Sequence, residues 1–216
     1  ILFVNFFNTS FLLAQIPTPN NYIDSLKWRN QAANAGNAVA QYQLGKILDL
    51  GINIETNKKQ AADWYAKAAI QGHVQAQMRL AQMYYHGEGV VKDLKKASKL
   101  FGSAAKVGMA LAQFNYATML EAGAGIKKNL SKAAKFYEKA ARAGVTEAQI
   151  SLAMLYARGK GVGLDLNKAM IWLEVAISQG ASIPKPVYDS LKSNMAPSQW
   201  KKIKKNVKIY KNQILN

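Results

Sequence analysis

The chain contains helical segments in which apolar and small side chains fall on one face. In residues 76–84 these side chains stand at positions i, i+4, i+7 and i+8, namely Ala76, Leu80, Met83 and Tyr84. Residues 97–105 show similar spacing with Ala97, Leu100, Phe101, Ala104 and Ala105. Steps of three and four residues place side chains on one face of an α-helix. The pattern therefore predicts two amphipathic helices joined by a short loop.

The two-helix pattern returns every 36 residues, and a glycine closes each repeat: Gly36, Gly72, Gly108, Gly144 and Gly180. In four of these five places, two alanines and two variable residues precede the glycine. Four full units align without a gap at 37–72, 73–108, 109–144 and 145–180, after a half-unit that begins at Trp28. A fixed period in this range is typical of stacked repeats, so we expect a repeat array over residues 28–180.

Residues with capping and turn chemistry stand at the predicted helix ends. A side chain that can accept a hydrogen bond from a free backbone N–H precedes the second helix of each unit: Asn57, Asp93, Asn129 and Asp165. The loop GEGVVKD at 87–93 has Gly87 to end the first helix and Gly89 for a backbone bend. The first unit has Asn53 in place of the second glycine, and asparagine tolerates the left-handed conformation better than most residues.

This pattern resembles the Sel1-like repeat family, a relative of the tetratricopeptide repeats. The resemblance rests on AQMRLAQMYYHGEGVVKDLKKASKLFGSAAKVG at 76–108 and AQISLAMLYARGKGVGLDLNKAMIWLEVAISQG at 148–180. It implies an all-α fold in which helix hairpins of 36 residues stack into a right-handed α/α superhelical solenoid. It also implies that the chain binds proteins or peptides as an adaptor. Asn53, and Tyr116 in place of the usual leucine, depart from the pattern without threatening the fold.

The resemblance places the first helix of each unit on the concave face of the solenoid. Tyr42, Met78, Phe114 and Ile150 then occupy one equivalent position and form an apolar ladder with polar neighbours. Apolar anchors with a polar rim suit a groove that binds a peptide or a helix. The partner-binding residues predicted on this face are Tyr42, Lys46, Met78, Gln82, Tyr85, His86, Leu111, Phe114, Thr118, Ile150, Met154 and Arg158. The alternative is that the ladder simply covers the core between neighbouring first helices.

The composition removes most catalytic chemistry. The 216 residues include no cysteine, which excludes disulfides, thiolate nucleophiles and cysteine-ligated metals. The two histidines, His73 and His86, lack a metal-ligand spacing, and the carboxylates form no paired acid–base site. The repeated G-x-G follows a helix rather than a strand, so it is a structural turn and not a phosphate loop. We expect no enzyme activity, no cofactor, no metal and no small-molecule substrate.

The formal net charge is +17, and it is unevenly distributed. Residues 37–180 carry 19 basic and 10 acidic side chains, whereas residues 181–216 carry eight lysines and Asp189. A positive field favours an acidic partner and makes association sensitive to salt. Nucleic-acid binding is less favoured, because the lysines are spread over helix exteriors without interleaved aromatic side chains.

The C-terminal segment combines an apolar face with a lysine face. Its apolar side chains recur at steps of three and four residues: Trp200, Ile203, Val207, Tyr210 and Ile214. Pro197 fits the first turn of this helix. We favour the interpretation that residues 181–216 are capping helices that seal the last unit. The alternative is a basic amphipathic helix that binds an anionic membrane or the cell envelope through Trp200, Lys201, Lys202, Lys204 and Lys205.

The first 14 residues are mostly apolar. They are too few to span a bilayer, which takes about 20, but they fit the apolar region of a signal peptide cleaved after Ala14. Without an initiator Met or a basic start, we expect this peptide to be truncated; the alternative is an amphipathic N-terminal segment. Residues 15–27 are predicted to be a linker and the start of the half-unit, because Pro17 and Pro19 prevent a regular helix around them.

These observations predict a non-enzymatic scaffold or adaptor that binds a protein or peptide on its concave face. A signal peptide would place it in the periplasm or outside the cell, and the alternative is a cytoplasmic location. The alternative function is association with a membrane or envelope surface through the C-terminal helix. Binding of nucleic acid is the least favoured of the three functions.

Overall fold

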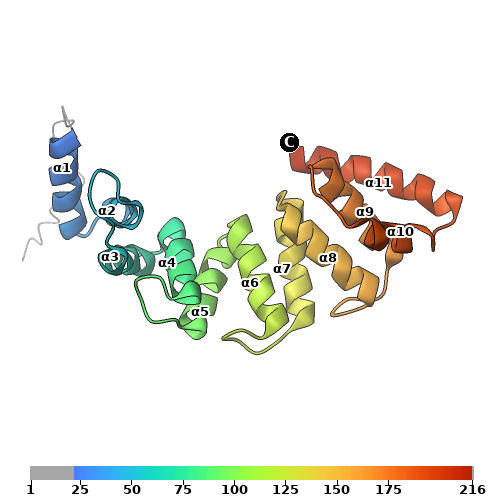
Figure 1. Cartoon of the computed structure of the whole chain (residues 1–216), viewed down its shortest axis with the longest axis horizontal. Helices are drawn as coiled ribbons and strands as arrows, with labels where there is room; N and C mark the ends of the chain where they lie inside the picture. The colour runs from blue at the N-terminus through green and yellow to red at the C-terminus, as the bar shows by residue number, and fades with distance from the viewer. Residues whose placement is uncertain (1–21, 216) are drawn as a thin grey trace, which may run out of the picture.

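The computed structural model describes residues 22–215, and in that range the chain forms eleven α-helices and no strand. The predicted signal peptide at 1–14 and the linker up to residue 21 lie outside the described residues. Successive helix hairpins follow one another along a curved array (Figure 1). The helices are α1 (Tyr22–Asn34), α2 (Ala38–Leu50), α3 (Lys58–Ile70), α4 (Val74–His86), α5 (Leu94–Lys106), α6 (Ala110–Ala122), α7 (Leu130–Arg142), α8 (Thr146–Arg158), α9 (Leu166–Ser178), α10 (Lys185–Lys192) and α11 (Pro197–Leu215).

The predicted capping residues begin the second helices α3, α5, α7 and α9. Each side chain accepts a hydrogen bond from the backbone N–H three residues further on, at 2.8–3.0 Å: Asn57, Asp93, Asn129 and Asp165. The first helices have two caps that the sequence analysis did not name, because Asn37 accepts from Ala40 and His73 Nδ1 accepts from Ala76. Side-chain caps therefore mark the start of these six helices, whereas α6 and α8 follow Met109 and Val145 without such a cap.

Left-handed residues end the helices and turn the chain. All five glycines that close the repeats have φ between 86° and 104°. Asn53, which replaces a loop glycine, has a φ of 57°, as its sequence position predicts. These residues allow tight turns of one length in every unit, so the hairpins stack in the same way along the array.

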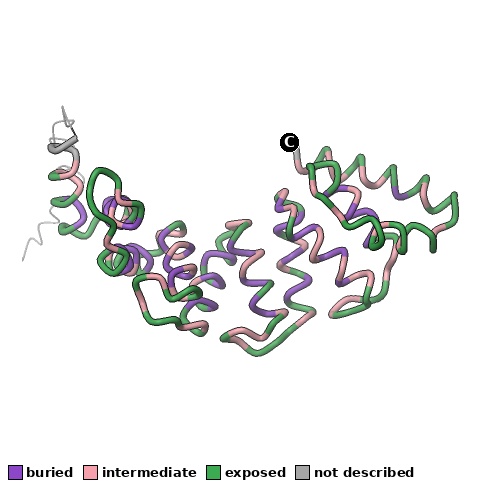
Figure 2. The backbone as a smooth tube through the Cα atoms, viewed as in Figure 1, coloured by how far each residue is buried: buried purple, intermediate pink, exposed green. Residues whose placement is uncertain are grey.

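The core runs between the helices along the whole array (Figure 2). Small side chains lie where the helices cross, and the alanines that stand four residues before the repeat glycines are fully buried: Ala68, Ala104, Ala140 and Ala176. Large side chains of the second helices fill the remaining space, including Tyr65, Phe101, Tyr137 and Leu173. The alternation of small and large residues gives close packing with little conformational freedom.

A repeated glutamine joins each unit to the preceding one. The side-chain amide Nε2 donates to a backbone carbonyl eight residues earlier, at 3.1–3.2 Å. The four donors are Gln41, Gln77, Gln113 and Gln149, and the acceptors are Ala33, Ala69, Ala105 and Ala141. Each of these carbonyls also accepts the backbone N–H of the repeat glycine that follows its helix, so the amide adds a second hydrogen bond that links the two units.

The C-terminal helix α11 packs against the second helices α9 and α7. Ile203 of α11 is 1% exposed and shares an apolar cluster with Ile171 of α9. The ring centroids of Tyr210 and Trp172 are 4.8 Å apart. The apolar face of α11 is therefore largely covered. No helix in the described part of the chain is both long enough and apolar enough to span a membrane.

The sequence of α9 contains a signal for this contact. Ile171 and Val175 are buried, whereas the equivalent positions of the preceding unit hold the exposed Lys135 and Lys139. Two positions that hold outward lysines in α7 are thus apolar in α9, the second helix against which α11 packs most extensively.

Candidate binding surface on the first helices

Helices α2, α4, α6 and α8 form the surface that the sequence analysis expects to be concave, here called the first-helix face. Two hollows open between successive first helices. The α2–α4 hollow has a volume of about 280 Å³ and the α4–α6 hollow one of about 180 Å³. The α2–α4 hollow is lined by Tyr42, Lys46, Asp49, Leu50, Tyr65, Gln75, Met78, Arg79, Gln82 and Met109.

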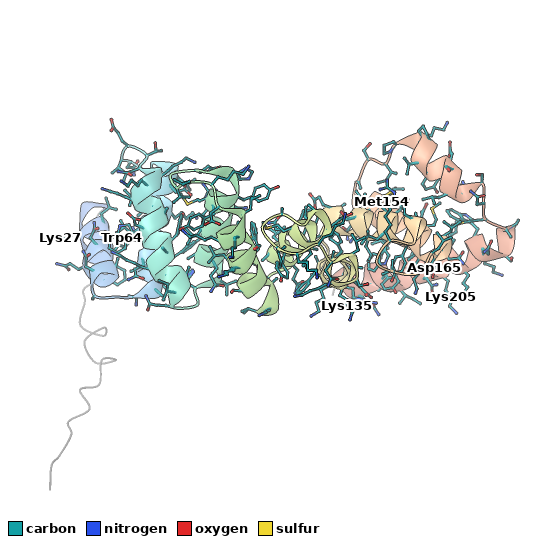
Figure 3. All side chains as sticks on the ribbon, turned by 90° about the horizontal axis from the view of Figure 1, so that it is seen from below. Lys27, Trp64, Lys135, Met154, Asp165 and Lys205 are labelled. Atoms are coloured by element: carbon teal, nitrogen blue, oxygen red, sulfur yellow. The ribbon has the colours of Figure 1, made fainter. Side chains whose placement is uncertain are left out.

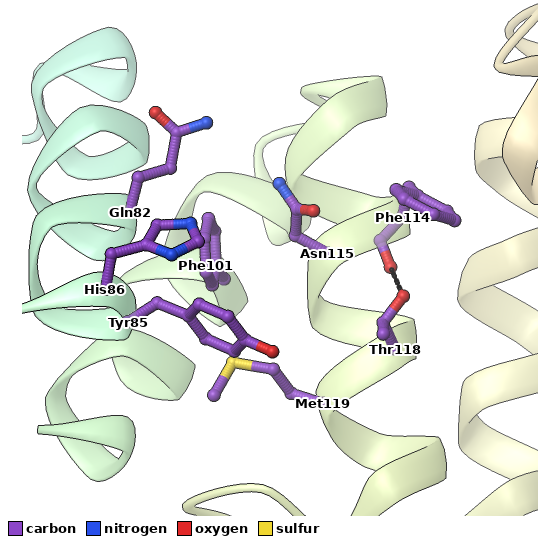
Figure 4. A pocket seen from close by; sticks show the side chains of 8 residues that line it. All are labelled: Gln82, Tyr85, His86, Phe101, Phe114, Asn115, Thr118 and Met119. Carbon is purple, nitrogen blue, oxygen red and sulfur yellow. Dashed lines mark hydrogen bonds between the residues drawn. The ribbon is translucent and has the colours of Figure 1, made fainter.

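The α4–α6 hollow has an apolar floor and a polar rim (Figure 4). Phe101 and Met119 are almost fully buried, with 3% and 2% of their surface exposed. The remaining lining residues are Gln82, Tyr85, His86, Phe114, Asn115 and Thr118. Amide and hydroxyl groups around an apolar floor can orient a peptide backbone while an apolar side chain enters the hollow.

An ionic network closes one side of the α2–α4 hollow. Arg79 donates to both carboxylate oxygens of Asp49, from Nε at 2.6 Å and from Nη2 at 2.9 Å. The same guanidinium donates to Glu88 at 2.8 Å, and Lys58 donates to Glu88 at 2.9 Å. The hydroxyl of Tyr65 donates to Asp49 at 3.3 Å. The network joins α2 and α3 of one unit to α4 of the next.

The electrostatics of this network hold its charges in place. The hydrogen bond from Arg79 lowers the pKa of Asp49 below its usual value, although burial opposes this effect. The hydrogen bonds from Lys58 and then Arg79 lower the pKa of Glu88. Burial, followed by the charge of Asp49, raises the pKa of Tyr65. These carboxylates are fixed in the ionised state by their cations and are not poised to transfer protons near neutral pH.

The two hollows bring together eight of the predicted partner-binding residues: Tyr42, Lys46, Met78, Gln82, Tyr85, His86, Phe114 and Thr118. Leu111, Ile150, Met154 and Arg158 do not line either hollow. No group of three His, Asp or Glu side chains within residues 22–215 could hold a metal ion.

The side chains of the apolar ladder are buried or partly buried. Met78 is 7% exposed and belongs to the core, and the Phe114 ring packs 5.8 Å from that of Tyr137. Tyr42 stacks on His73 with 4.5 Å between ring centroids. Tyr42, Met78 and Phe114 thus pack against the core and also line the hollows, whereas Ile150 lines neither, and binding by the ladder remains a prediction.

The sequence analysis missed Arg79, Phe101 and Asn115 as lining residues. Arg79 and Asn115 occupy the same repeat position, where the other units have Gln43 and Ser151. A polar position whose residue type changes from unit to unit, between apolar or aromatic neighbours, was the available signal.

The charge of the array is segregated between its two sets of helices. The first helices α2, α4, α6 and α8 carry three basic and three acidic residues. The second helices α3, α5, α7 and α9 carry twelve basic and three acidic residues. Figure 3 marks Lys135 on α7 and Lys205 on α11 among these exposed lysines. The positive field thus originates on the second helices and α11, and not on the first-helix face.

Comparison with known proteins identifies the repeat. The family model described as the Sel1 repeat matches residues 38–73, 74–109, 110–145 and 146–180. A Sel1 repeat protein from Oxalobacter formigenes has a similar crystal structure, with 29% identity, a TM-score of 0.66, and coverage of 74% of this chain and 68% of that chain. No match was found among curated proteins.

A second similar structure is c5321, described as a protective antigen present in uropathogenic Escherichia coli strains displaying an SLR fold. The identity is 26% and the TM-score 0.58, with coverage of 95% of this chain and 52% of that chain. This chain thus spans about half the length of that protein. The matched repeats begin one residue after the units found by the 36-residue period. The chain belongs to the Sel1 repeat family.

Proposed function

We propose that this chain is a non-enzymatic scaffold that holds a protein or peptide along its first-helix face. Sel1 repeat proteins generally mediate protein–protein interaction. The observation that carries the proposal is the pair of hollows between α2, α4 and α6. The α4–α6 hollow has an apolar floor with amide and hydroxyl groups at its rim, and the α2–α4 hollow has Tyr42 and Met78 beside the ion pair of Arg79 and Asp49. Such a surface offers apolar anchoring sites and hydrogen bonds to an extended or helical segment.

A pull-down from an extract of the parent cells tests this proposal. One bait is the chain itself, and a second carries Gln82→Ala, Tyr85→Ala and His86→Ala, which alter the rim and avoid the buried Met78. We expect a protein that the first bait retains to be reduced at least tenfold on the second, because the rim contacts are lost.

The matched control carries Ile70→Ser and Val107→Ser, which remove apolar side chains that are 88% and 70% exposed at the ends of second helices. It should retain the partner as well as the unchanged chain does. Equal recovery on all three baits would show that the rim of the α4–α6 hollow makes no contact with the partner, which would contradict the proposal.

A second candidate function is association with an anionic surface through the lysine face of α11. The supporting observation is that Lys201, Lys202, Lys204 and Lys205 are exposed while the apolar face packs on α9. Attachment would then be electrostatic, at roughly 1 kcal/mol per lysine near an anionic bilayer, without insertion of the helix. The acidic partner that the net charge favours would bind the lysine face of α11 or the basic second helices.

Flotation with vesicles that contain phosphatidylserine tests the second candidate. A variant with these four lysines changed to Gln keeps the α11–α9 contact intact. We expect the unchanged chain to float with the vesicles at low salt, and the variant to lose most of this binding. Equal flotation of the two proteins would rule out the lysine face.

We further infer that residues 181–216 cap the array, because α10 and α11 follow the last unit and α11 covers the outer face of α9. A periplasmic or secreted location remains our proposal from the apolar start of the sequence.

A further inference from the structure

Two of the three boundaries between full units share an acid and a tyrosine but differ in charge, whereas the boundary of units two and three has Tyr85 and Phe101 at these positions. At the boundary of units one and two, the carboxylate of Asp49 receives the Tyr65 hydroxyl from its own unit and the Arg79 guanidinium from the next. The guanidinium binds both carboxylate oxygens, which is the strongest arrangement for this pair. The chain therefore contains an internal example of arginine bound at this place on the first-helix face.

At the boundary of units three and four, the acid and the tyrosine recur but the arginine does not. Glu121 and Tyr137 lie 72 residues after Asp49 and Tyr65, and the Tyr137 hydroxyl donates to Glu121 Oε2 at 2.8 Å. The place of Arg79 is taken by Ser151. None of the ion pairs found in the described part of the chain involves Glu121.

The surroundings of Glu121 are also more acidic than those of Asp49. Lys46 is replaced by Thr118, and Gln75 by the exposed Glu147. The nearest cation on α8, Arg158, lies seven residues after Ser151, which is about 10 Å along the helix. Lys58 and Glu88 are replaced by Leu130 and Lys160, so the positions equivalent to the Asp49 network and its neighbours carry two carboxylates and one cation here, against two carboxylates and three cations at the first boundary.

The carboxylate of Glu121 lies close to the α4–α6 hollow. Thr118 lines that hollow, and its Oγ1 lies 3.2 Å from the Tyr137 hydroxyl that donates to Glu121. A single partner segment can therefore contact the apolar floor of the hollow and the carboxylate of Glu121.

We propose that the bound partner is an extended segment that places an arginine against Glu121 and an apolar side chain in the α4–α6 hollow. Arginine fits better than lysine because its planar guanidinium can bind both carboxylate oxygens, as Arg79 does with Asp49. Neighbouring helices lie on the order of 10 Å apart, and an extended chain advances about 3.3 Å per residue, so the two side chains stand about three residues apart. This inference rests on the proposed function of the first-helix face.

The first experiment introduces an arginine of the chain itself next to Glu121. Ser151→Arg restores the residue type found at Arg79, and we expect it to raise the Tm by about 2–4 °C through an ion pair with Glu121. In a Glu121→Gln background, where Tyr137 keeps an acceptor, the same substitution should not raise the Tm. An equal effect of Ser151→Arg in both backgrounds would overturn the inference.

The second experiment uses synthetic peptides in both chain directions, with the cores Leu-Gly-Ser-Arg and Arg-Gly-Ser-Leu, and citrulline versions of each as uncharged controls. Binding is followed by NMR titration of the whole chain. We expect one arginine peptide to bind at least tenfold more tightly than its citrulline version, and Glu121→Gln to abolish this preference.

Two peptide results would overturn the inference. If arginine and citrulline peptides bind equally, the first-helix face binds peptides without an arginine site, so the proposed function stands and the inference fails. If no peptide binds, the arginine motif is wrong, whereas the proposed function is judged separately by the pull-down.

Discussion

Replacing Arg79 with methionine is expected to lower the free energy of unfolding at pH 7 by about 3–5 kcal/mol. The side chain of Asp49 is only 3% exposed, and the substitution removes the two hydrogen bonds at 2.6 and 2.9 Å that hold it. Lys58 lies 3.7 Å from Asp49 and is 45% exposed, so it compensates only in part. Urea denaturation, followed by circular dichroism, measures the change.

The loss should depend on pH in a direction that the structure determines. In the unchanged chain, Arg79 lowers the folded-state pKa of Asp49, so this group stabilises the fold above the unfolded pKa of about 3.9 and loses that contribution as pH falls through the folded pKa. In the variant, the guanidinium that lowers the pKa of Asp49 is gone while burial still raises it, so we expect this pKa to be higher than in the unchanged chain. Protonation of Asp49 then removes the buried charge in the variant. The difference in free energy of unfolding between the unchanged chain and the variant should therefore become smaller as the pH falls from 7 to 4.

The control for this prediction is the double variant Asp49→Asn with Arg79→Met. Because it removes the buried charge as well as its partner, it should be more stable at pH 7 than Arg79→Met alone. A loss of stability that is the same at both pH values, and is not recovered by Asp49→Asn, would show that Arg79 acts through packing alone.

The hairpins and their ends could be predicted because the signals for them are local. Asn57, Asp93, Asn129 and Asp165 cap helices through an N–H only three residues away. Asn53 adopts the left-handed conformation that its place in the loop demands. The period of 36 residues then extends each local result to the whole array.

Contacts between units could not be predicted in the same way. Arg79 reaches Asp49 across 30 residues, and only the stacking of α4 on the first hairpin shows that the two side chains meet. The repeated glutamines were visible in the sequence, but their carbonyl acceptors belong to the preceding unit. Such pairs depend on the rotation between neighbouring units, which no local pattern encodes.

The candidate site was predicted only in part, because the prediction used equivalent positions of the first helices in the 36-residue repeat. Register places Tyr85, His86 and Phe114 at the α4–α6 hollow, but it gives no weight to second-helix residues. Phe101 of α5 forms the floor because the gap between α4 and α6 opens onto the helix behind them. Ile150 and Met154 share the register of the lining residues, yet they line neither hollow.

The second large effect is expected from Gly125→Ala, with a loss of about 2–5 kcal/mol in the free energy of unfolding. Gly125 has a φ of 66°, where a side chain is strained, and an added Cβ would overlap the backbone carbonyl of Leu94. Leu94 begins α5 of the preceding unit, and the Ser98 hydroxyl lies 3.2 Å from the carbonyl oxygen of Gly125. The loop therefore cannot move away without opening the contact between units two and three.

Gly108→Ala separates this contact from backbone strain. Gly108 has a φ of 104°, but nothing lies within 4 Å of an added Cβ, so the substitution should cost only the left-handed strain of about 1–2 kcal/mol. Urea denaturation of the two variants side by side gives the difference, which measures how tightly each loop is held against the helix behind it. If both substitutions lower the free energy of unfolding by the same amount, Gly125 matters only for the backbone conformation of its loop. The stacking of units would then depend on the apolar core and the glutamine contacts instead.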